Sequence, residues 1–425
     1  MSDRAAPAML FACHDCGRVH RVAGLADGGT AVCSRCGGVL LRRREAGVEH
    51  ALALNVAGLL LFGVANLFPL MTLRMAGQEQ ATTLLGGVTA LHRAGLWELA
   101  GLVLLVAALI PLLKLAGSVW VLALARAGRL TRAQAPVFRL MEVLHPWSMT
   151  EVYLLGLIVA WVKLRDLATI ELGLALFALV GLILLMLWAE AALEPHEVWE
   201  RVLPQAREQP GEDPTRAPLL ACHTCAQLVR PEDLPDAEHA RCPRCGAALH
   251  RRKPQSLART WALLIAATIL YVPANLLPIM TVVSLGSGEA DTILSGVRAL
   301  IAAGMWPVAL LVFFASITVP VLKVVALVYL LVTTQRGSAA RRLDRTRLYR
   351  VIEAVGRWSM VDIFMIAILV GLVSLGELAT IEPGTGAVAF AAVVILTMMA
   401  SHAFDPRLMW DAGETCDDGR PEIRA

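Results

Sequence analysis

Eight cysteines of the sequence form four Cys-x-x-Cys pairs, arranged as two sets of two pairs. Two tight turns that each direct two thiolates to one tetrahedral centre are typical of structural zinc sites, although the spacing also admits iron. No leader-like apolar stretch precedes the first pair, so we expect a reducing compartment, where such pairs bind metal rather than form disulfides. The sequence therefore predicts two bound Zn²⁺ ions, and the expected ligands are Cys13, Cys16, Cys33, Cys36, Cys222, Cys225, Cys242 and Cys245.

The predicted metal sites favour a structural role over redox sensing. Glycine follows the second cysteine of a pair at Gly17, Gly37 and Gly246, where a tight turn needs a permissive backbone. His14 and His223 lie between paired cysteines and are interpreted as bystanders. Four thiolates leave no open coordination position for catalysis. No Walker loop or dinucleotide-binding glycine motif is present, so we expect neither an enzyme nor a nucleic-acid partner.

Charged residues inside apolar runs are the second chemical signal. Lys114 and Lys323 each follow a proline by three residues, and Glu151 and Asp362 lie in the next apolar run. A charge within a membrane span is costly and usually marks a pathway or a pair. Counting along the helices places Lys323 and Asp362 at a similar depth, about 16 Å, so we expect a lysine beside an acid in each unit. Such a pair either fixes the helix register or forms part of a transport pathway.

Polar residues distinguish the second half of the chain from the first. Three hydroxyl residues of the second half are expected to line a cavity there. At two of these three positions, the first half has an alanine or a methionine instead. If only one half holds a substrate, the sequence favours the second. The hydroxyl residues are Ser316, Ser359 and Thr397, and their counterparts are Ala107, Ser148 and Met186.

The elements that carry these residues occur twice. The sequence is 57% hydrophobic and only 17% charged, and its apolar runs approach the length of about 20 residues that crosses a bilayer. The cysteine set recurs at an offset of 209 residues, as does Asn66-Leu-Phe-Pro-Leu-Met-Thr72, which matches Asn275-Leu-Leu-Pro-Ile-Met-Thr281. Trp147-Ser-Met149 matches Trp358-Ser-Met360 at an offset of 211. So many spaced matches establish an internal duplication.

The predicted fold is an α-helical polytopic membrane protein with two tandem parallel repeats, each a four-cysteine ribbon followed by four spans. Two further segments, 82–93 and 291–302, are too short to span and are expected to be interfacial or re-entrant helices. The predicted boundaries are ribbon 1 at 1–45, unit 1 at 46–200, a linker at 201–218, ribbon 2 at 219–253, unit 2 at 254–411 and a polar tail at 412–425. The predicted spans are 48–73, 96–125, 141–164 and 170–192 in unit 1, and 257–283, 305–334, 351–376 and 385–403 in unit 2.

Arginine-rich loops predict the orientation of the chain. The loops after the second span of each unit carry most of the arginines in the short connections, as at Arg129 and Arg341. Because positively charged loops remain in the cytoplasm, we expect both ribbons and both termini to be cytosolic. Four spans return the chain to its starting side, which makes the two repeats parallel.

Three motifs resemble those of the paraquat-inducible protein A family: Asp291-Thr-Ile-Leu-Ser-Gly296, Gly356-Arg-Trp-Ser-Met-Val-Asp362 and Phe404-Asp-Pro-Arg-Leu-Met-Trp-Asp411. The resemblance covers nearly the whole chain. It departs in unit 1, where His145-Pro146-Trp147 replaces Gly356-Arg357-Trp358.

The resemblance implies a bacterial inner-membrane protein that passes phospholipid to a periplasmic MCE-domain tunnel protein. It also implies a polar network within the membrane, formed by Lys323, Asp362, Ser316, Ser359 and Thr397, while Lys114 and Glu151 occupy the equivalent charged positions of unit 1. The residues alone leave two alternatives open, an ion- or proton-coupled transporter of small polar solutes and a zinc-ribbon scaffold or sensor without a substrate.

Overall fold

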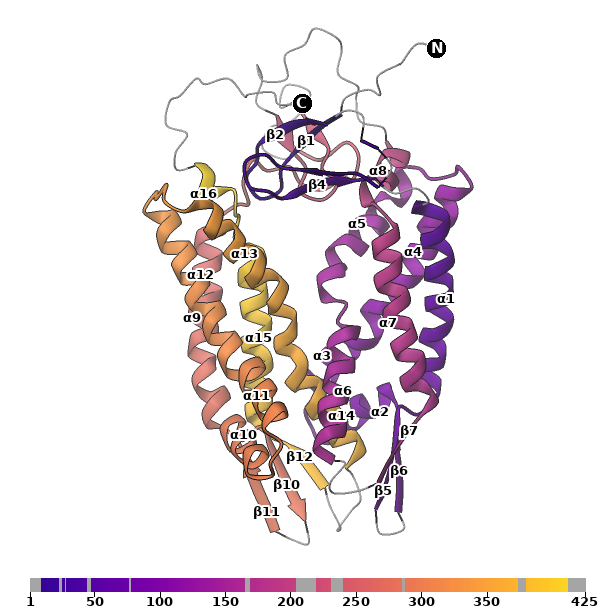
Figure 1. Cartoon of the computed structure of the whole chain (residues 1–425), viewed down its shortest axis with the longest axis vertical. Helices are drawn as coiled ribbons and strands as arrows, with labels where there is room; N and C mark the ends of the chain where they lie inside the picture. Colours follow the sequence, from indigo (N-terminus) through magenta and orange to yellow (C-terminus); the bar gives the residue numbers. More distant parts are fainter. Residues whose placement is uncertain are drawn as a thin grey trace.

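The computed structural model describes residues 9–22, 25–26, 28–43, 47–75, 78–164, 169–203, 219–230, 240–284, 287–373 and 380–411. Within these residues, two helical units stand side by side, and the cysteine ribbons cover one end of both (Figure 1). We call this end the ribbon end and the opposite one the sheet end. The predicted linker lies outside the described residues from 204 onward, and the predicted tail at 412–425 lies outside them entirely.

The described residues contain 8 helices long and apolar enough to cross a membrane, four in each unit, as the sequence predicts. Mean hydropathy exceeds 1.2 over each of them. Unit 1 contains the spans Gly47–Leu67 (α1), Trp97–Arg126, Arg132–Val162 and Leu174–Ala192 (α7). Unit 2 contains Ser256–Leu276 (α9), Trp306–Gln335, Arg342–Leu372 and Thr385–Ala403 (α15).

The second span of each unit stays continuous across its proline because a turn of π-helix precedes it. A proline lacks the N–H that an α-helix requires, and the longer hydrogen bonds of a π-turn pass over the missing donor. Pro111 and Pro320 each occupy the second residue of the α-helix after that turn. The segments are α3 (Trp97–Val103), η1 (Leu104–Leu109) and α4 (Ile110–Arg126), then α11 (Trp306–Phe313), η5 (Phe314–Thr318) and α12 (Val319–Gln335).

The third span of each unit is interrupted about halfway by a short 3₁₀ turn. This break puts Glu151 and Asp362 in the first turn of the helix that follows. The span also begins earlier than the sequence predicts, at 132 and 342 rather than 141 and 351. The segments are α5 (Ala135–Leu144), η3 (His145–Trp147) and α6 (Thr150–Leu164), then α13 (Arg342–Gly356), η6 (Arg357–Met360) and α14 (Val361–Leu372).

Each unit carries a three-stranded antiparallel sheet at the sheet end, which the sequence analysis did not anticipate. The first predicted span, 48–73, is too long because its last residues enter the central strand. The short segments near 82–93 and 291–302 are helices, each capped by a threonine hydroxyl that accepts from the backbone N–H three residues on. The elements are β5 (Met71–Met75), β6 (Gln78–Thr82), β7 (Thr169–Leu172) and α2 (Leu84–Arg93), then β10 (Met280–Ser284), β11 (Ser287–Asp291), β12 (Thr380–Pro383) and α10 (Ile293–Ala302).

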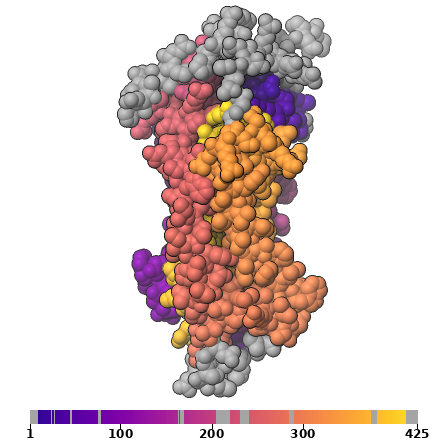
Figure 2. Space-filling model, turned by 90° about the vertical axis from the view of Figure 1, so that its left-hand side faces the viewer, coloured from indigo at the N-terminus to yellow at the C-terminus, as the bar shows by residue number. Residues whose placement is uncertain are grey.

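The outer face of unit 2 is apolar where a bilayer would contact it. Figure 2 shows this face, on which α9 lies beside the second span of unit 2. Large apolar side chains there are exposed, including Ile269, which is 65% exposed, and Val325, which is 59% exposed. Exposed apolar surface on helices of spanning length is the expected contact with lipid chains.

The two ribbons are crossed, since each docks on the helical unit of the other repeat. The cysteines of ribbon 1 share a buried cluster with Tyr349 and Phe404 of unit 2, whereas those of ribbon 2 share one with Phe138 and Trp199 of unit 1. Trp199 belongs to a short helix that follows the last span of unit 1. The ribbon strands are β1 (Met9–Ala12), β2 (Val19–Val22), β3 (Thr30–Val32), β4 (Val39–Arg42), β8 (Leu220–Ala221) and β9 (Leu228–Val229), and the helices after the last spans are α8 (Pro195–Val202) and α16 (Leu408–Asp411).

Ion pairs hold each crossed ribbon in place. Arg350 of α13 donates to Asp15 of ribbon 1 through Nε at 2.8 Å and Nη2 at 2.5 Å. Burial raises the pKa of Asp15, but hydrogen bonds from His14 and Arg350 outweigh it and leave that pKa below its usual value. In the other ribbon, Arg244 donates to Glu200 of α8 at 2.7 Å.

Helix α14 joins the two units at the level of the membrane. All of its described side chains are buried, and it packs against α6 and α2 of unit 1. Two glycines allow the close approach. A Cβ added at Gly87 would lie 2.8 Å from the Ala367 carbonyl oxygen, and one added at Gly156 would lie 2.9 Å from the Phe364 Cβ. Small residues serve this purpose between membrane helices generally.

We expect Arg350→Ala to loosen ribbon 1 from unit 2. The substitution removes charge-assisted hydrogen bonds at a half-buried site, which costs about 1.5–3 kcal/mol of docking free energy. Limited proteolysis of the purified protein checks this, with faster cleavage within ribbon 1 as the expected result. Arg347→Ala, at an exposed position one turn earlier, serves as the matched control and should leave the cleavage rate unchanged. Wild-type protection in the Arg350→Ala variant would contradict the crossed arrangement.

Candidate metal centres and intramembrane polar sites

The eight predicted ligands gather into two clusters, in which the four Sγ atoms all lie within 4.8 Å of one another. The Sγ atoms of Cys13 and Cys36 are 3.4 Å apart, and those of Cys222 and Cys245 are 3.5 Å apart. Both separations are far longer than a disulfide bond of about 2.05 Å and approach the edge of a tetrahedron whose metal–sulfur bonds measure about 2.3 Å. Each cluster can therefore hold one metal ion without disulfide formation.

The backbone of each turn is shaped as a four-thiolate site requires. Gly17, Gly37 and Gly246 have φ values of 73°, 68° and 69°, in the left-handed region that favours glycine. The fourth turn uses Ala226, which adopts the same region with φ 56°. In all four turns the N–H of this residue donates to the carbonyl of the first cysteine of the pair, at 2.9–3.0 Å.

Two hydrogen-bond donors that the sequence analysis missed contact the sulfurs of ribbon 1. His20 Nε2 lies 3.1 Å from Cys33 Sγ, and Arg350 Nη2 lies 3.4 Å from Cys36 Sγ. Donors of this kind orient ligands and stabilise thiolate charge around a bound metal. The side chain of His14, which was expected to be a bystander, is 65% exposed and contacts Asp15. No spacing rule singles out His20, because strand pairing brings it to the site.

The five polar residues predicted in unit 2 are all buried in its membrane-spanning helices. They come from η5, α12, η6, α14 and α15, and η6 contacts both η5 and α15. The side chains of Ser316 and Thr397 donate to carbonyls of their own helices, at 2.7 Å and 3.0 Å. The exposed fractions are 0% for Ser316, 4% for Lys323, 2% for Ser359, 3% for Asp362 and 1% for Thr397.

The contacts of Lys323 differ from the pairing with Asp362 that the sequence predicts. Its Nζ makes no hydrogen bond with the described part of the chain, so it is not hydrogen-bonded to Asp362 as the predicted pair requires. Instead the ammonium lies against Gly356, where an added Cβ would be only 2.8 Å from Nζ. The Ser359 hydroxyl also has no hydrogen-bond partner among the described residues. Buried polar atoms without protein partners call for another polar group, a water or a ligand.

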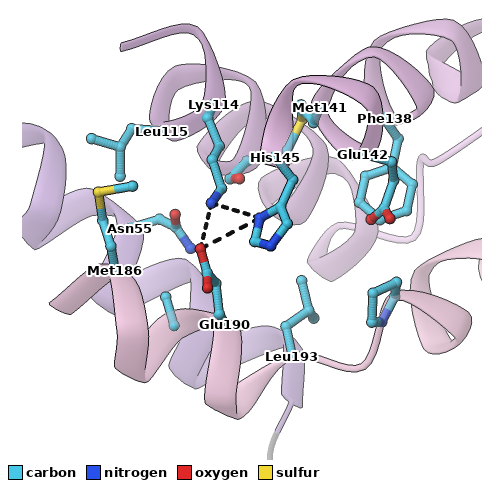
Figure 3. A pocket seen from close by; sticks show the side chains of 13 residues that line it. Asn55, Lys114, Leu115, Phe138, Met141, Glu142, His145, Met186, Glu190 and Leu193 are labelled. Carbon is cyan, nitrogen blue, oxygen red and sulfur yellow. Dashed lines mark hydrogen bonds and ion pairs between the residues drawn. The ribbon is translucent and has the colours of Figure 1, made fainter. Parts of the chain in front are cut away.

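Lys114 of unit 1 has partners other than the one expected. It pairs with Glu190 of α7 and lies 3.0 Å from His145 Nδ1, rather than pairing with Glu151 of the third span (Figure 3). The 3₁₀ turn that breaks the third span brings His145 towards Lys114 and leaves Glu151 in the next helix. Glu190 lies two residues before the end of α7, and a charge so near the end of a span was not singled out from the sequence.

A pocket of about 250 Å³ surrounds this ion pair in the ribbon-side half of unit 1. The sequence analysis favoured unit 2 as the more polar unit and did not anticipate it. Its walls combine charged and polar side chains with apolar ones from α1, α4, α5 and α7. They are formed by Asn55, Lys114, Leu115, Ser118, Phe138, Met141, Glu142, His145, Met186, Ala189, Glu190, Leu193 and Pro195.

The sequence profile described as Paraquat-inducible protein A matches residues 48–202 and 257–414, which correspond to the two helical units. The chain belongs to the paraquat-inducible protein A family. Intermembrane transport protein PqiA of Escherichia coli strain K12 is 36% identical over 405 residues, covering 94% of this chain and 95% of the relative. No solved structure matches the chain significantly.

Two further relatives carry similar descriptions. Lipophilic envelope-spanning tunnel protein A of Escherichia coli strain K12 is 32% identical over 91% of this chain and 87% of its own length. A probable intermembrane transport protein of Haemophilus influenzae is 28% identical over 95% of this chain and 96% of its own length. The family, the duplicated unit and the eight spans together establish a multi-pass membrane protein of an envelope transport family.

We expect the purified protein to contain two metal ions per chain, one for each four-cysteine cluster. Cys13→Ser removes one of four ligands from ribbon 1, and Cys222→Ser does the same in ribbon 2, so each variant should retain one ion. Elemental mass spectrometry of the purified proteins measures the content and identifies the metal. Cys416→Ser, which changes the ninth cysteine, should keep both ions. Two ions in Cys13→Ser would contradict the proposed ligand set.

Proposed function

We propose that this protein is the inner-membrane subunit of a cell-envelope lipid-transport system, which passes phospholipid between the inner membrane and a periplasmic MCE-domain tunnel protein. Membership of a family whose relatives are named intermembrane transport proteins supports transport between membranes. The name of one relative, a lipophilic envelope-spanning tunnel protein, supports a lipophilic cargo. The chain carries no enzymatic role in this proposal.

The buried ammonium of Lys323 is the observation that carries the proposal. Lys323 has no hydrogen-bond partner among the described residues, and an unpartnered cation inside a membrane span is expensive and indicates a functional position. Phosphate is the group best suited to it, because an ammonium binds phosphate as a point charge. In the proposed path, Ser316, Ser359 and Thr397 supply hydroxyls around the phosphate, and Asp362 of the third span belongs to the same polar set. Lys114 and Glu151 occupy the equivalent positions of unit 1.

We also propose zinc as the metal of both ribbons and the cytosol as their location. Four buried thiolates close the coordination sphere, which suits a structural zinc ion. The arginine-rich loops lie at the ribbon end, which supports a cytosolic position for the ribbons and for both termini. In this orientation the two sheets face the periplasm, where they would meet the tunnel partner.

A second candidate is an ion- or proton-coupled transporter of small polar solutes, which the charged residues within the spans also favour. It predicts solute or ion flux in liposomes that contain this protein alone. A scaffold or redox sensor without a substrate is the third candidate, and it predicts that thiol oxidation controls a partner. Retained function after Cys→Ser changes in both ribbons would remove that third candidate.

We expect Lys323→Ala to abolish envelope-barrier function, reducing detergent resistance to that of a deletion strain, while the protein still accumulates in the membrane. The reason is that the variant removes the only cation of the unit 2 polar set. Survival on detergent plates, with immunoblots of membrane fractions, provides the measurement. Leu322→Ala changes the adjacent residue, whose side chain is 59% exposed, and should retain the barrier. A wild-type barrier in Lys323→Ala would remove the proposed path.

A further inference from the structure

The pocket of unit 1 has an amphiphilic character that the proposed path in unit 2 does not explain. The side chains of Lys114, His145 and Glu190 point towards one another, and Phe138 and Met186 contribute apolar walls (Figure 3). Its volume of about 250 Å³ lies just below the range typical of small-molecule pockets, so it accommodates a headgroup but not a whole two-chain lipid.

The pocket holds two acids and one lysine. Lys114 pairs with Glu190, and Glu142 is a second acid in the same pocket. His145 Nδ1 is 3.0 Å from Lys114 Nζ and 3.6 Å from a carboxylate oxygen of Glu190, so the imidazole stands beside both signs of charge. A second acid within a membrane span ionises at least cost when a positive group lies beside it. The pocket therefore suits a ligand that carries an amine as well as an anion.

The duplicated unit shows that the Lys114–Glu190 ion pair is not needed to build the helix bundle. Unit 2 keeps a lysine and an acid at the positions of Lys114 and Glu142, as Lys323 and Glu353, but buried apolar side chains stand at three of the other equivalent positions. Leu264, Leu327 and Phe404 there are 1%, 0% and 0% exposed. The residues that replace Asn55, Ser118, His145, Glu190 and Leu193 are Leu264, Leu327, Gly356, Ser401 and Phe404, respectively. Because the same arrangement of spans forms without the ion pair, a role in helix register alone does not account for it.

Apolar surface continues outward from the pocket on two of the helices that line it. On α5, Leu140 and Val143 are 50% and 58% exposed, and on α7, Leu187 and Trp188 are 46% and 66% exposed. Surface of this kind on spanning helices accommodates acyl chains. The side chains of Glu190 and His145 are 36% and 46% exposed, so the charged end of the pocket is open to a ligand.

We propose that the unit 1 pocket binds a phosphate–amine headgroup, the chemistry of an ethanolamine phospholipid. The phosphate accepts hydrogen bonds from Lys114 and His145, and the ammonium donates to Glu190 and Glu142. The acyl chains remain outside, along α5 and α7. This inference rests on the proposed role in lipid transport and adds a second, headgroup-selective site in the other unit. A water-soluble phosphate–amine compound shares the same chemistry, and the experiment below separates the two sources.

Matched photo-crosslinking probes test the proposal in the full-length protein. A diazirine amino acid of methionine size replaces Met186 in the pocket, and in a second protein it replaces Thr397, the equivalent residue of unit 2. The proteins are placed in nanodiscs that contain phosphate-labelled lipid with either an ethanolamine or a glycerol headgroup. We expect the ethanolamine lipid to label position 186 about tenfold more than the glycerol lipid, the difference that one lost charged contact produces.

Substitutions of the charged pocket residues test which interactions the labelling at position 186 depends on. Glu142→Gln should abolish the preference for the amine-bearing lipid, since it removes the second acid of the pocket at nearly constant shape. The double variant Lys114→Met with Glu190→Met removes both partners of the ion pair without leaving an unpaired charge, and it should reduce labelling at 186 about tenfold. Glu49→Gln, at a position on α1 that is 72% exposed, is the control and should change neither result.

The labelling results distinguish the unit 1 pocket from the proposed path in unit 2 and test the chemistry of the ligand. Label at 397 but not at 186 would overturn this inference and leave the proposed function standing. Equal labelling of 186 by both headgroups would overturn the assignment of an amine. Label at neither position, in a folded protein that retains its metal, would overturn both proposals. Finally, complete displacement of lipid from 186 by an equal concentration of soluble phosphoethanolamine would overturn the lipid as the source of the headgroup.

Discussion

A lysine inside a membrane span is costly unless its charge is compensated, and the two halves of this protein place their lysines in different surroundings. The two lysines, Lys114 and Lys323, occupy the same place in the repeat, three residues after the proline of the second span. Unit 1 compensates the charge with Glu190 in an open pocket. Unit 2 instead buries its lysine to 4% exposure beside Gly356, with hydroxyl groups from neighbouring elements. One fold therefore supports two different electrostatic environments.

The two units are not independent modules, because they are tied together at different levels. At the ribbon end, each ribbon docks on the unit of the other repeat, so each cysteine cluster packs against the opposite half. Nearer the sheet end, α14 of unit 2 is buried against α6 and α2 of unit 1, where glycines allow backbone contact. Connections at both ends restrict rigid-body separation of the units. Changes confined to the interior of a single unit meet fewer such constraints.

Much of this architecture could be predicted from the sequence because its signals are local or repetitive. The length of the apolar runs predicts the eight spans, and the spacing of the paired cysteines predicts both cysteine clusters, since these features depend on composition and short spacing. The sheets at the sheet end escaped notice because their strands are short and one of them follows directly from an apolar run. The crossing of the ribbons could not be predicted, because nothing local in Asp15 or Arg350 identifies the partner. The predicted pairing of Lys114 with Glu151 is wrong for a related reason, since the break at His145 changes which helix faces the lysine.

Duplication followed by divergence supplies an internal control that a single copy cannot offer. Both units retain the π-turn before the proline, the broken third span and the three-stranded sheet, so these features belong to the shared fold. His145 and Glu190 differ from their counterparts Gly356 and Ser401, and neither change alters the arrangement of the spans. A side chain that the fold does not require, yet that places charge within a membrane, is costly to keep without another use. The divergence thus leaves the two halves with different environments for their lysines, an open pocket with two acids in unit 1 and a closed interior in unit 2.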